Sequence, residues 1–143
     1  MARLKGGRFN DKIVGTRFND HISGGPGHDN LIGKTGNDTI KGDSGNDHIF
    51  GGKGADKLFG GSGHDVFKFN NGDGFGGDIV KDYVDGSDKF DIPSSLFVPT
   101  GANYSGPLGT GVIVTYHDVN GFDSGNFLVL GYSQAQFSLD DFI

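Results

Sequence analysis

An aspartate recurs at every ninth position through the first half of the chain. Each of these aspartates is preceded five positions earlier by glycine and followed two positions later by an apolar side chain. A short fixed period is typical of solenoids, in which units without a core of their own stack on their neighbours. The units span residues 6–68 and read GGRFNDKIV, GTRFNDHIS, GGPGHDNLI, GKTGNDTIK, GDSGNDHIF, GGKGADKLF and GGSGHDVFK.

Each unit divides into a glycine-rich half that favours turns and a three-residue half that suits a short strand. Only the eighth position is apolar in every unit, so one side chain per unit points inward and strands must pair in parallel from coil to coil. Because the chain has 28 glycines and only four alanines, long helices are disfavoured and an all-β parallel β-roll is predicted. Two units complete one coil, which gives two columns of aspartates: Asp11, Asp29, Asp47 and Asp65, and Asp20, Asp38 and Asp56.

These columns point to a bound cation. Neighbouring aspartates in one column lie about 4.8 Å apart, the spacing of paired strands, and repel one another. Ca²⁺ accepts about six to eight hard oxygens in irregular geometry, whereas Mg²⁺ requires a stricter octahedron. The inward side chains bury too little apolar surface to order so glycine-rich a repeat. We therefore expect calcium between successive turns and a repeat region that folds as calcium binds.

The remaining composition excludes several classes of protein. All 18 acids are aspartates against 12 basic residues, and the net charge of −6 disfavours nucleic acid as a partner. The absence of glutamate excludes an EF-hand, and the absence of cysteine excludes disulfides and thiolate metal sites. No apolar stretch is long enough to span a membrane, and we expect no enzyme activity because no recognisable catalytic motif is present.

Residues 24–68 closely resemble the G-G-x-G-x-D-x-U-x repeat of the RTX (repeats-in-toxin) calcium-binding family. The resemblance implies a right-handed parallel β-roll with one ion between repeats i and i+2. Its ligands are the position 2 and 4 carbonyls and the aspartate of one turn, with the position 1 and 3 carbonyls and the aspartate of the next coil. The implied sets are Gly25, Gly27 and Asp29 with Gly42, Ser44 and Asp47; Lys34, Gly36 and Asp38 with Gly51, Lys53 and Asp56; and Asp43, Gly45 and Asp47 with Gly60, Ser62 and Asp65. Gly54 and Gly63, also at position 4, complete the candidate carbonyl ligands.

The first two repeats depart from this pattern, because Phe9 and Phe18 replace the position 4 glycine. A side chain is penalised at positive φ. Asp11 and Asp20 are therefore the weaker candidates for metal ligands, and we expect these two units to form an N-terminal cap.

Beyond residue 68 the chain resembles the C-terminal region of serralysin-type proteases, alginate epimerase R-modules and other type I secretion substrates. The segments that carry this resemblance are Asp78-Ile-Val-Lys-Asp82-Tyr83, Gly86-Ser-Asp-Lys-Phe-Asp91-Ile92 and Leu139-Asp-Asp-Phe-Ile143. It implies that Asp73 and Asp78 close the final calcium sites and that the C-terminus is an uncleaved signal for an ABC-type secretion machinery. Alternating residues at 112–116 and 127–130 predict antiparallel strands. We expect a roll over residues 1–68 and a C-terminal β cap over 69–143, packed as one domain.

Together these features predict a non-catalytic, secreted calcium-binding module with about five ions that folds outside the cell and uses type I (ABC) secretion. One alternative is a carbohydrate-binding module, similar to epimerase R-modules, that holds an acidic polysaccharide through basic side chains at outward strand positions, namely Lys12, Lys41, Lys57 and Lys68. Another alternative is the C-terminal domain of a larger secreted enzyme such as a metalloprotease.

Overall fold

The computed structural model describes residues 1–70, 77–92, 96–106, 109–118, 124–131 and 139–143. Its described strands form two sheets. The first sheet has the order β1 (Arg3–Lys5), β3 (His21–Pro26), β5 (Thr39–Ser44), β7 (Lys57–Ser62), β9 (Asp78–Val80), β13 (Ser124–Leu130), β12 (Gly109–Asp118) and β11 (Leu96–Gly106). The second sheet has the order β10 (Lys89–Asp91), β8 (Val66–Lys68), β6 (His48–Lys53), β4 (Asn30–Thr35) and β2 (Lys12–Val14).

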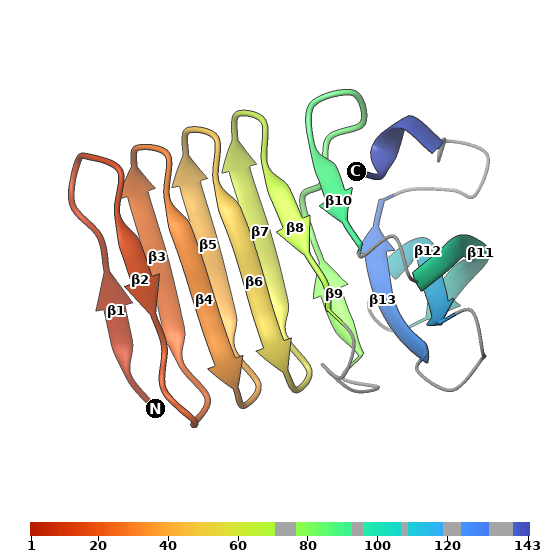
Figure 1. Ribbon diagram of the computed structural model, residues 1–143, viewed down its shortest axis with the longest axis horizontal. Coiled ribbons are helices and arrows are strands. Elements are labelled where there is room, and N and C mark those ends of the chain that lie inside the picture. Colours follow the sequence, from red (N-terminus) through yellow and green to blue (C-terminus); the bar gives the residue numbers. More distant parts are fainter. Residues whose placement is uncertain (71–76, 93–95, 107–108, 119–123, 132–138) are drawn as a thin grey trace.

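The strands of the repeats alternate between the two sheets and pair in parallel with the strand one coil away. Ile22 lies beside Ile40 and Leu31 beside Ile49, so the register between coils is 18 residues, as the two-unit coil predicts. Figure 1 shows these coils stacked side by side from β1 and β2 to β9 and β10. The chain is thus a parallel β-solenoid of about four turns, which confirms the predicted roll.

The core of the roll is the column of eighth-position side chains between the two sheets. Six of them are 0–2% exposed: Ile22, Leu31, Ile40, Ile49, Leu58 and Phe67. At the N-terminal end, Leu4 and Ile13 are only partly buried because no further coil covers them in this structure. A single apolar position per repeat is therefore enough to build a continuous core once the coils stack.

The C-terminal part closes the other end of the roll with aromatic side chains. Strand β13 pairs in parallel with β9, and β12 pairs antiparallel with both β13 and β11, as the alternating residues predicted for β12 and β13. The rings of Phe69 and Phe127 stack with centroids 4.1 Å apart, and those of Tyr83 and Phe90 with centroids 4.6 Å apart. This cluster continues the core of the roll beyond Phe67.

The last residues of the chain are held against the final coil. They form a short 3₁₀ helix, η2 (Leu139–Asp141), and then a β-bridge between Phe142 and Phe90. The Tyr83 hydroxyl donates a hydrogen bond to Asp141 Oδ1 at 2.5 Å, and Asp141 is 1% exposed. In the described residues, no helix is long and apolar enough to cross a membrane.

Candidate metal centre

The turns between the two sheets place the repeat aspartates in two columns, as the nine-residue period predicts. Within each column, the Oδ1 atom of one aspartate accepts a hydrogen bond from the backbone N–H of the aspartate one coil earlier. The donor and acceptor pairs are Asp11 and Asp29 (2.7 Å), Asp20 and Asp38 (2.7 Å), Asp29 and Asp47 (2.8 Å), Asp38 and Asp56 (2.7 Å), and Asp47 and Asp65 (2.9 Å). One carboxylate oxygen of each acceptor is thereby fixed, and the direction of the other is set.

In most of the inner aspartates, the second carboxylate oxygen has no hydrogen-bond partner among the described residues. It is buried and makes no hydrogen bond in four of them: Asp29, Asp38, Asp47 and Asp65. A buried, unpaired carboxylate oxygen is costly, and buried charges are normally paired or bound to a metal. These four oxygens are therefore the strongest indication in the structure that a cation belongs between the turns.

Backbone carbonyl oxygens face the same space. A Cβ atom built on Gly33 would lie 2.3 Å from Asp38 Oδ2 and 2.4 Å from the carbonyl oxygen of Gly51, one coil further on. A Cβ atom on Gly42 would lie 2.3 Å from Asp47 Oδ2 and 2.4 Å from the oxygen of Gly60. Carboxylate and carbonyl oxygens from successive coils thus converge on one small space, and hard oxygens of this kind suit Ca²⁺.

Position 4 of each inner turn accepts only glycine. Gly27, Gly36, Gly45, Gly54 and Gly63 all have positive φ. A Cβ atom on Gly45 would lie 1.8 Å from the carbonyl oxygen of Gly27, so a side chain there would collide with the neighbouring turn as well as strain the backbone.

Two non-glycine residues share this left-handed conformation at position 2 of their turns. Lys34 has φ of 85° and Asp43 has φ of 77°. Gly25, at the same position of its own turn, has φ of 102°. The fold therefore imposes one turn conformation on all the inner repeats, even where the residue disfavours it.

The position 3 carbonyls of the implied ligand sets already take part in the turns. The oxygens of Ser44, Lys53 and Ser62 each accept a backbone hydrogen bond from the position 4 glycine one coil earlier, at 2.8–2.9 Å. A carbonyl oxygen has two lone pairs, so each of them retains one for a cation.

The turns of the first two repeats are built differently. Asp11 Oδ2 accepts a hydrogen bond from Gly7 N at 2.6 Å. Asp20 Oδ2 accepts hydrogen bonds from Thr16 N and Thr16 Oγ1, both at 2.7 Å. Hydrogen bonds lower the pKa of Asp20. The largest contribution comes from the Ala2 amide, and the Thr16 hydroxyl and amide add to it. The Oδ2 atoms of these two carboxylates are thus hydrogen-bonded within their own turns, and neither turn contains a residue with positive φ.

At the C-terminal end of the roll, three aspartates outside the repeats accept hydrogen bonds from the backbone of the last two repeats. Asp78 Oδ1 accepts from Asp56 N at 2.9 Å, and Asp88 Oδ1 accepts from Asp65 N at 3.0 Å, so each continues one column. Asp82 accepts from Gly60 N and Gly61 N and so fixes the last repeat turn.

The nine-residue pattern does not identify Asp82 and Asp88 as members of the site. The available signal for Asp88 was its apolar neighbour two positions on, Phe90, which repeats the spacing of the nonapeptides. Asp73, which the resemblance proposed as a closing ligand, lies outside the described residues.

The electrostatics of the inner columns differ from those of an exposed carboxylate. Burial raises the pKa of Asp38, Asp47 and Asp88, and it raises the pKa of Asp65 to about 6. The negative charges of Asp88, Asp47 and Asp82 add to the effect at Asp65. The inner turns therefore disfavour ionised carboxylates unless a positive charge is supplied.

Within the described ranges, no three His, Cys, Asp or Glu side chains are grouped so that they could hold a metal ion by themselves.

The basic side chains proposed for polysaccharide binding lie on two different faces. Lys41 and Lys57 belong to β5 and β7 of the first sheet, whereas Lys12 and Lys68 belong to the second sheet. Lys68 forms an ion pair with Asp91.

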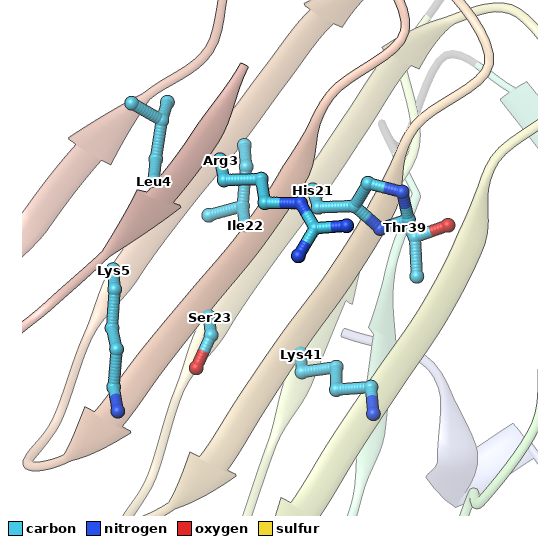
Figure 2. A pocket seen from close by; sticks show the side chains of 8 residues that line it. All are labelled: Arg3, Leu4, Lys5, His21, Ile22, Ser23, Thr39 and Lys41. Atoms are coloured by element: carbon cyan, nitrogen blue, oxygen red, sulfur yellow. The ribbon is translucent and has the colours of Figure 1, made fainter. Parts of the chain in front are cut away.

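The outer face of the first sheet carries a shallow hollow. Figure 2 shows Arg3, Lys5, His21 and Lys41 around it. Its volume is about 320 Å³, and its lining includes no acidic side chain. The Lys41 ammonium group also lies over the ring of Phe59, 5.3 Å from the centroid. The hollow is thus a positively charged surface on a chain of negative net charge.

The fold and the two carboxylate columns define a class, a parallel β-solenoid with columns of aspartates in its turns. Residues 5–40 and 32–67 match the family model of the RTX calcium-binding nonapeptide repeat (4 copies). The repeat region therefore matches the RTX repeat, a calcium-binding repeat by its description, and the resemblance seen in the sequence is confirmed.

Several solved structures are similar to the whole chain. The solution structure of the AlgE6R3 subunit from the Azotobacter vinelandii mannuronan C5-epimerase is 28% identical, with 96% of this chain and 80% of that chain covered and a TM-score of 0.48. For the AlgE6R2 subunit of the same epimerase, the identity is 27%, the coverage 98% and 91%, and the TM-score 0.45.

A third similar structure is that of the extracellular lipase LipA from Serratia marcescens. It is 13% identical, with 96% of this chain and 39% of that chain covered and a TM-score of 0.46. A search of the curated proteins gives no match.

Proposed function

We propose that this chain is a calcium-binding module whose repeat region folds when calcium binds. The observation that carries the proposal is the set of four buried carboxylate oxygens without a hydrogen-bond partner, in repeats three, four, five and seven. When bound, calcium supplies the positive charge that these oxygens lack. The side chains and carbonyls of successive coils then hold one another in place through the ion.

Three inner sites lie between facing aspartates of successive coils, namely Asp29 and Asp47, Asp47 and Asp65, and Asp38 and Asp56. In the first two sites, both aspartates have a buried carboxylate oxygen without a hydrogen-bond partner. The facing carbonyls of Gly42, Gly60 and Gly51, respectively, support the ligand sets implied by the repeat pattern. Two terminal sites, closed by Asp78 and Asp88, bring the proposed number to about five.

We further propose that the chain is secreted unfolded and folds outside the cell, where calcium is available. Without calcium, the aspartates of each column repel one another across neighbouring coils. RTX repeat proteins are typically secreted, which agrees with this order of events.

The C-terminal residues proposed as the signal for ABC-type secretion are docked in the folded structure. Asp141 is buried, the ring of Phe142 lies 5.7 Å from that of Phe90, and Ile143 N donates to the Phe90 carbonyl at 2.9 Å. A secretion machinery would therefore read this tail before the roll folds. In this proposal residues 1–68 and 69–143 fold as one non-catalytic domain.

Calorimetric titration with calcium, combined with far-ultraviolet circular dichroism, tests the proposed function. We expect several calcium ions to bind per chain and the β signal to appear with calcium and disappear with excess EDTA. An unchanged β spectrum in EDTA, together with no heat of calcium binding, would contradict the proposal.

A second candidate function is binding of an acidic polysaccharide on the first sheet. The hollow around Arg3, Lys5 and Lys41 favours it, because these cations face a common space that contains no acidic side chain. Calorimetry with alginate in the presence of calcium tests this function. The double variant Arg3→Ala and Lys41→Ala is expected to lose the binding heat, whereas Lys12→Ala on the second sheet is expected to retain it. No heat with the unaltered protein would rule this candidate out.

A further inference from the structure

A second ladder of hydrogen bonds runs beside each column of aspartates. It is made by the side chain at position 5, the residue immediately before the aspartate. This side chain accepts a hydrogen bond from the backbone N–H of the position 5 residue one coil later. We call it the position 5 ladder. Its acceptor and donor pairs are Asn10 and His28 (2.9 Å), Asn19 and Asn37 (2.9 Å), His28 and Asn46 (2.7 Å), Asn37 and Ala55 (3.0 Å), and Asn46 and His64 (3.1 Å).

The position 5 ladder runs in the direction opposite to the aspartate ladder. Asn46 Oδ1 reaches forward to His64 N, whereas Asp65 Oδ1 reaches back to Asp47 N. Each pair of successive turns is therefore tied in both directions by two adjacent residues. The amide that Asn46 holds belongs to the residue just before Asp65, so this contact fixes the backbone from which a proposed calcium ligand projects.

The glycine at position 4 makes room for this ladder. A Cβ atom on Gly63 would lie 3.0 Å from Asn46 Oδ1, and one on Gly54 would lie 3.0 Å from Asn37 Oδ1. Tight contacts of this kind would push the acceptor away from the amide that it holds. Glycine at position 4 thus serves both the turn conformation and the position 5 ladder.

The side chains of the position 5 ladder accept hydrogen bonds through Asn Oδ1 or His Nδ1, and none belongs to the proposed calcium ligands. We infer that Asn46 and Asn37 are positioning residues that hold the turns in register for calcium, each for its own column. This inference rests on the proposed calcium function. Asn46 acts on Asp65 in one column, and Asn37 acts on the turn that ends at Asp56 in the other.

The test compares Asn46→Ala, Asn37→Ala, Asn46→His and Asn30→Ala in the full chain by calcium titration followed by NMR. The amide signals of Gly63 and Gly54 report the two columns separately. Asn46→His is the conservative variant, because His28 already accepts an amide hydrogen bond in that column. Asn30→Ala is the matched control, because Asn30 is exposed on a strand and its side chain makes no hydrogen bond in the described structure.

We expect Asn46→Ala to weaken calcium binding about 2- to 10-fold at Gly63 with less change at Gly54, and Asn37→Ala to do the reverse. Asn46→His is expected to restore binding, and Asn30→Ala to leave both columns unchanged. Equal weakening of both columns by each alanine variant, or an effect of Asn46→Ala no larger than that of Asn30→Ala, would overturn the inference. If the unaltered protein shows no calcium-dependent shifts, the proposed function itself fails.

Discussion

The first coil and the inner coils of the roll carry the same aspartate in the same register, yet they use it differently. In the first coil, the second oxygen of Asp11 and Asp20 accepts hydrogen bonds from the residue four positions earlier. In the inner coils, the corresponding oxygen is buried without such a donor. The turn conformation decides the difference, because positive φ at positions 2 and 4 occurs only in the inner turns. An aspartate at the nine-residue spacing is therefore not sufficient for a candidate cation site.

The largest expected difference in calcium affinity is between the variants Asp47→Asn and Asp11→Asn. Asparagine keeps the oxygen that accepts the Asp29 amide but loses the charge that faces both neighbouring sites. We expect Asp47→Asn to lower calcium affinity by at least about tenfold, whereas Asp11→Asn changes it by less than about threefold. Calorimetry measures both, and equal losses would break the distinction between the two regions.

The second contrast concerns alanine at two turn glycines. Gly45→Ala places a Cβ atom 1.8 Å from a carbonyl oxygen at φ of 124°, whereas the nearest contact of a Cβ atom on Gly7 is 3.7 Å away, at Asp11 Oδ2. We expect Gly45→Ala to lower the free energy of unfolding by about 2 kcal/mol or more and Gly7→Ala to change it by less than about 1 kcal/mol. Thermal unfolding in saturating calcium compares them, and similar losses would show that the inner turn does not need glycine.

The third prediction concerns pH in the absence of calcium. The raised pKa values of Asp38, Asp47 and Asp65 mean that these groups favour the folded state when protonated. Their contribution to the stability of the folded state is complete below the ordinary pKa of 3.8. It is lost as pH rises through their pKa values in the folded state, about 6 for Asp65. Asp20 has a lowered pKa, so its ionised form favours the folded state. Its contribution to stability is present above pH 3.8 and is lost as pH falls below that value.

We therefore expect calcium-free protein to gain β structure as pH falls from 7 towards 4, and calcium-loaded protein to lose bound ions over the same range. Circular dichroism in EDTA and in calcium checks both directions. A loss of β structure on acidification in EDTA would contradict the prediction.

The smallest expected effect comes from converting a first-coil turn into an inner turn. The double variant Thr16→Gly and Phe18→Gly removes the hydroxyl that binds Asp20 and permits positive φ at positions 2 and 4. We expect one additional calcium ion per chain, with the affinity of the other sites changed by less than about threefold. Atomic absorption on dialysed protein counts the ions, and an unchanged count would show that more than these two residues separates the regions.

The sequence alone predicts the repeat architecture well because its period fixes the register. One inward side chain and one aspartate per unit determine the coil, the core column and the two carboxylate columns. The inner turns were also identified by their glycines, which the positive φ values explain.

The ends of the roll could not be predicted in the same way. The segment from Asp82 to Asp88 is one residue longer than a repeat turn, so the period fails where Asp88 continues its column. The hydrogen bonds that satisfy Asp11 and Asp20 depend on the direction of backbone amides, which composition does not reveal. Strand β11 was likewise not predicted, because its residues show no clear alternation.

A crystal structure of the protein grown with calcium, with anomalous diffraction to locate the ions, tests the central claim most directly. The account predicts calcium peaks between Asp29 and Asp47, between Asp47 and Asp65, and between Asp38 and Asp56, and none in the turn of Gly7 and Asp11. Inner turns without calcium peaks, or equal peaks in the first turn, would contradict it.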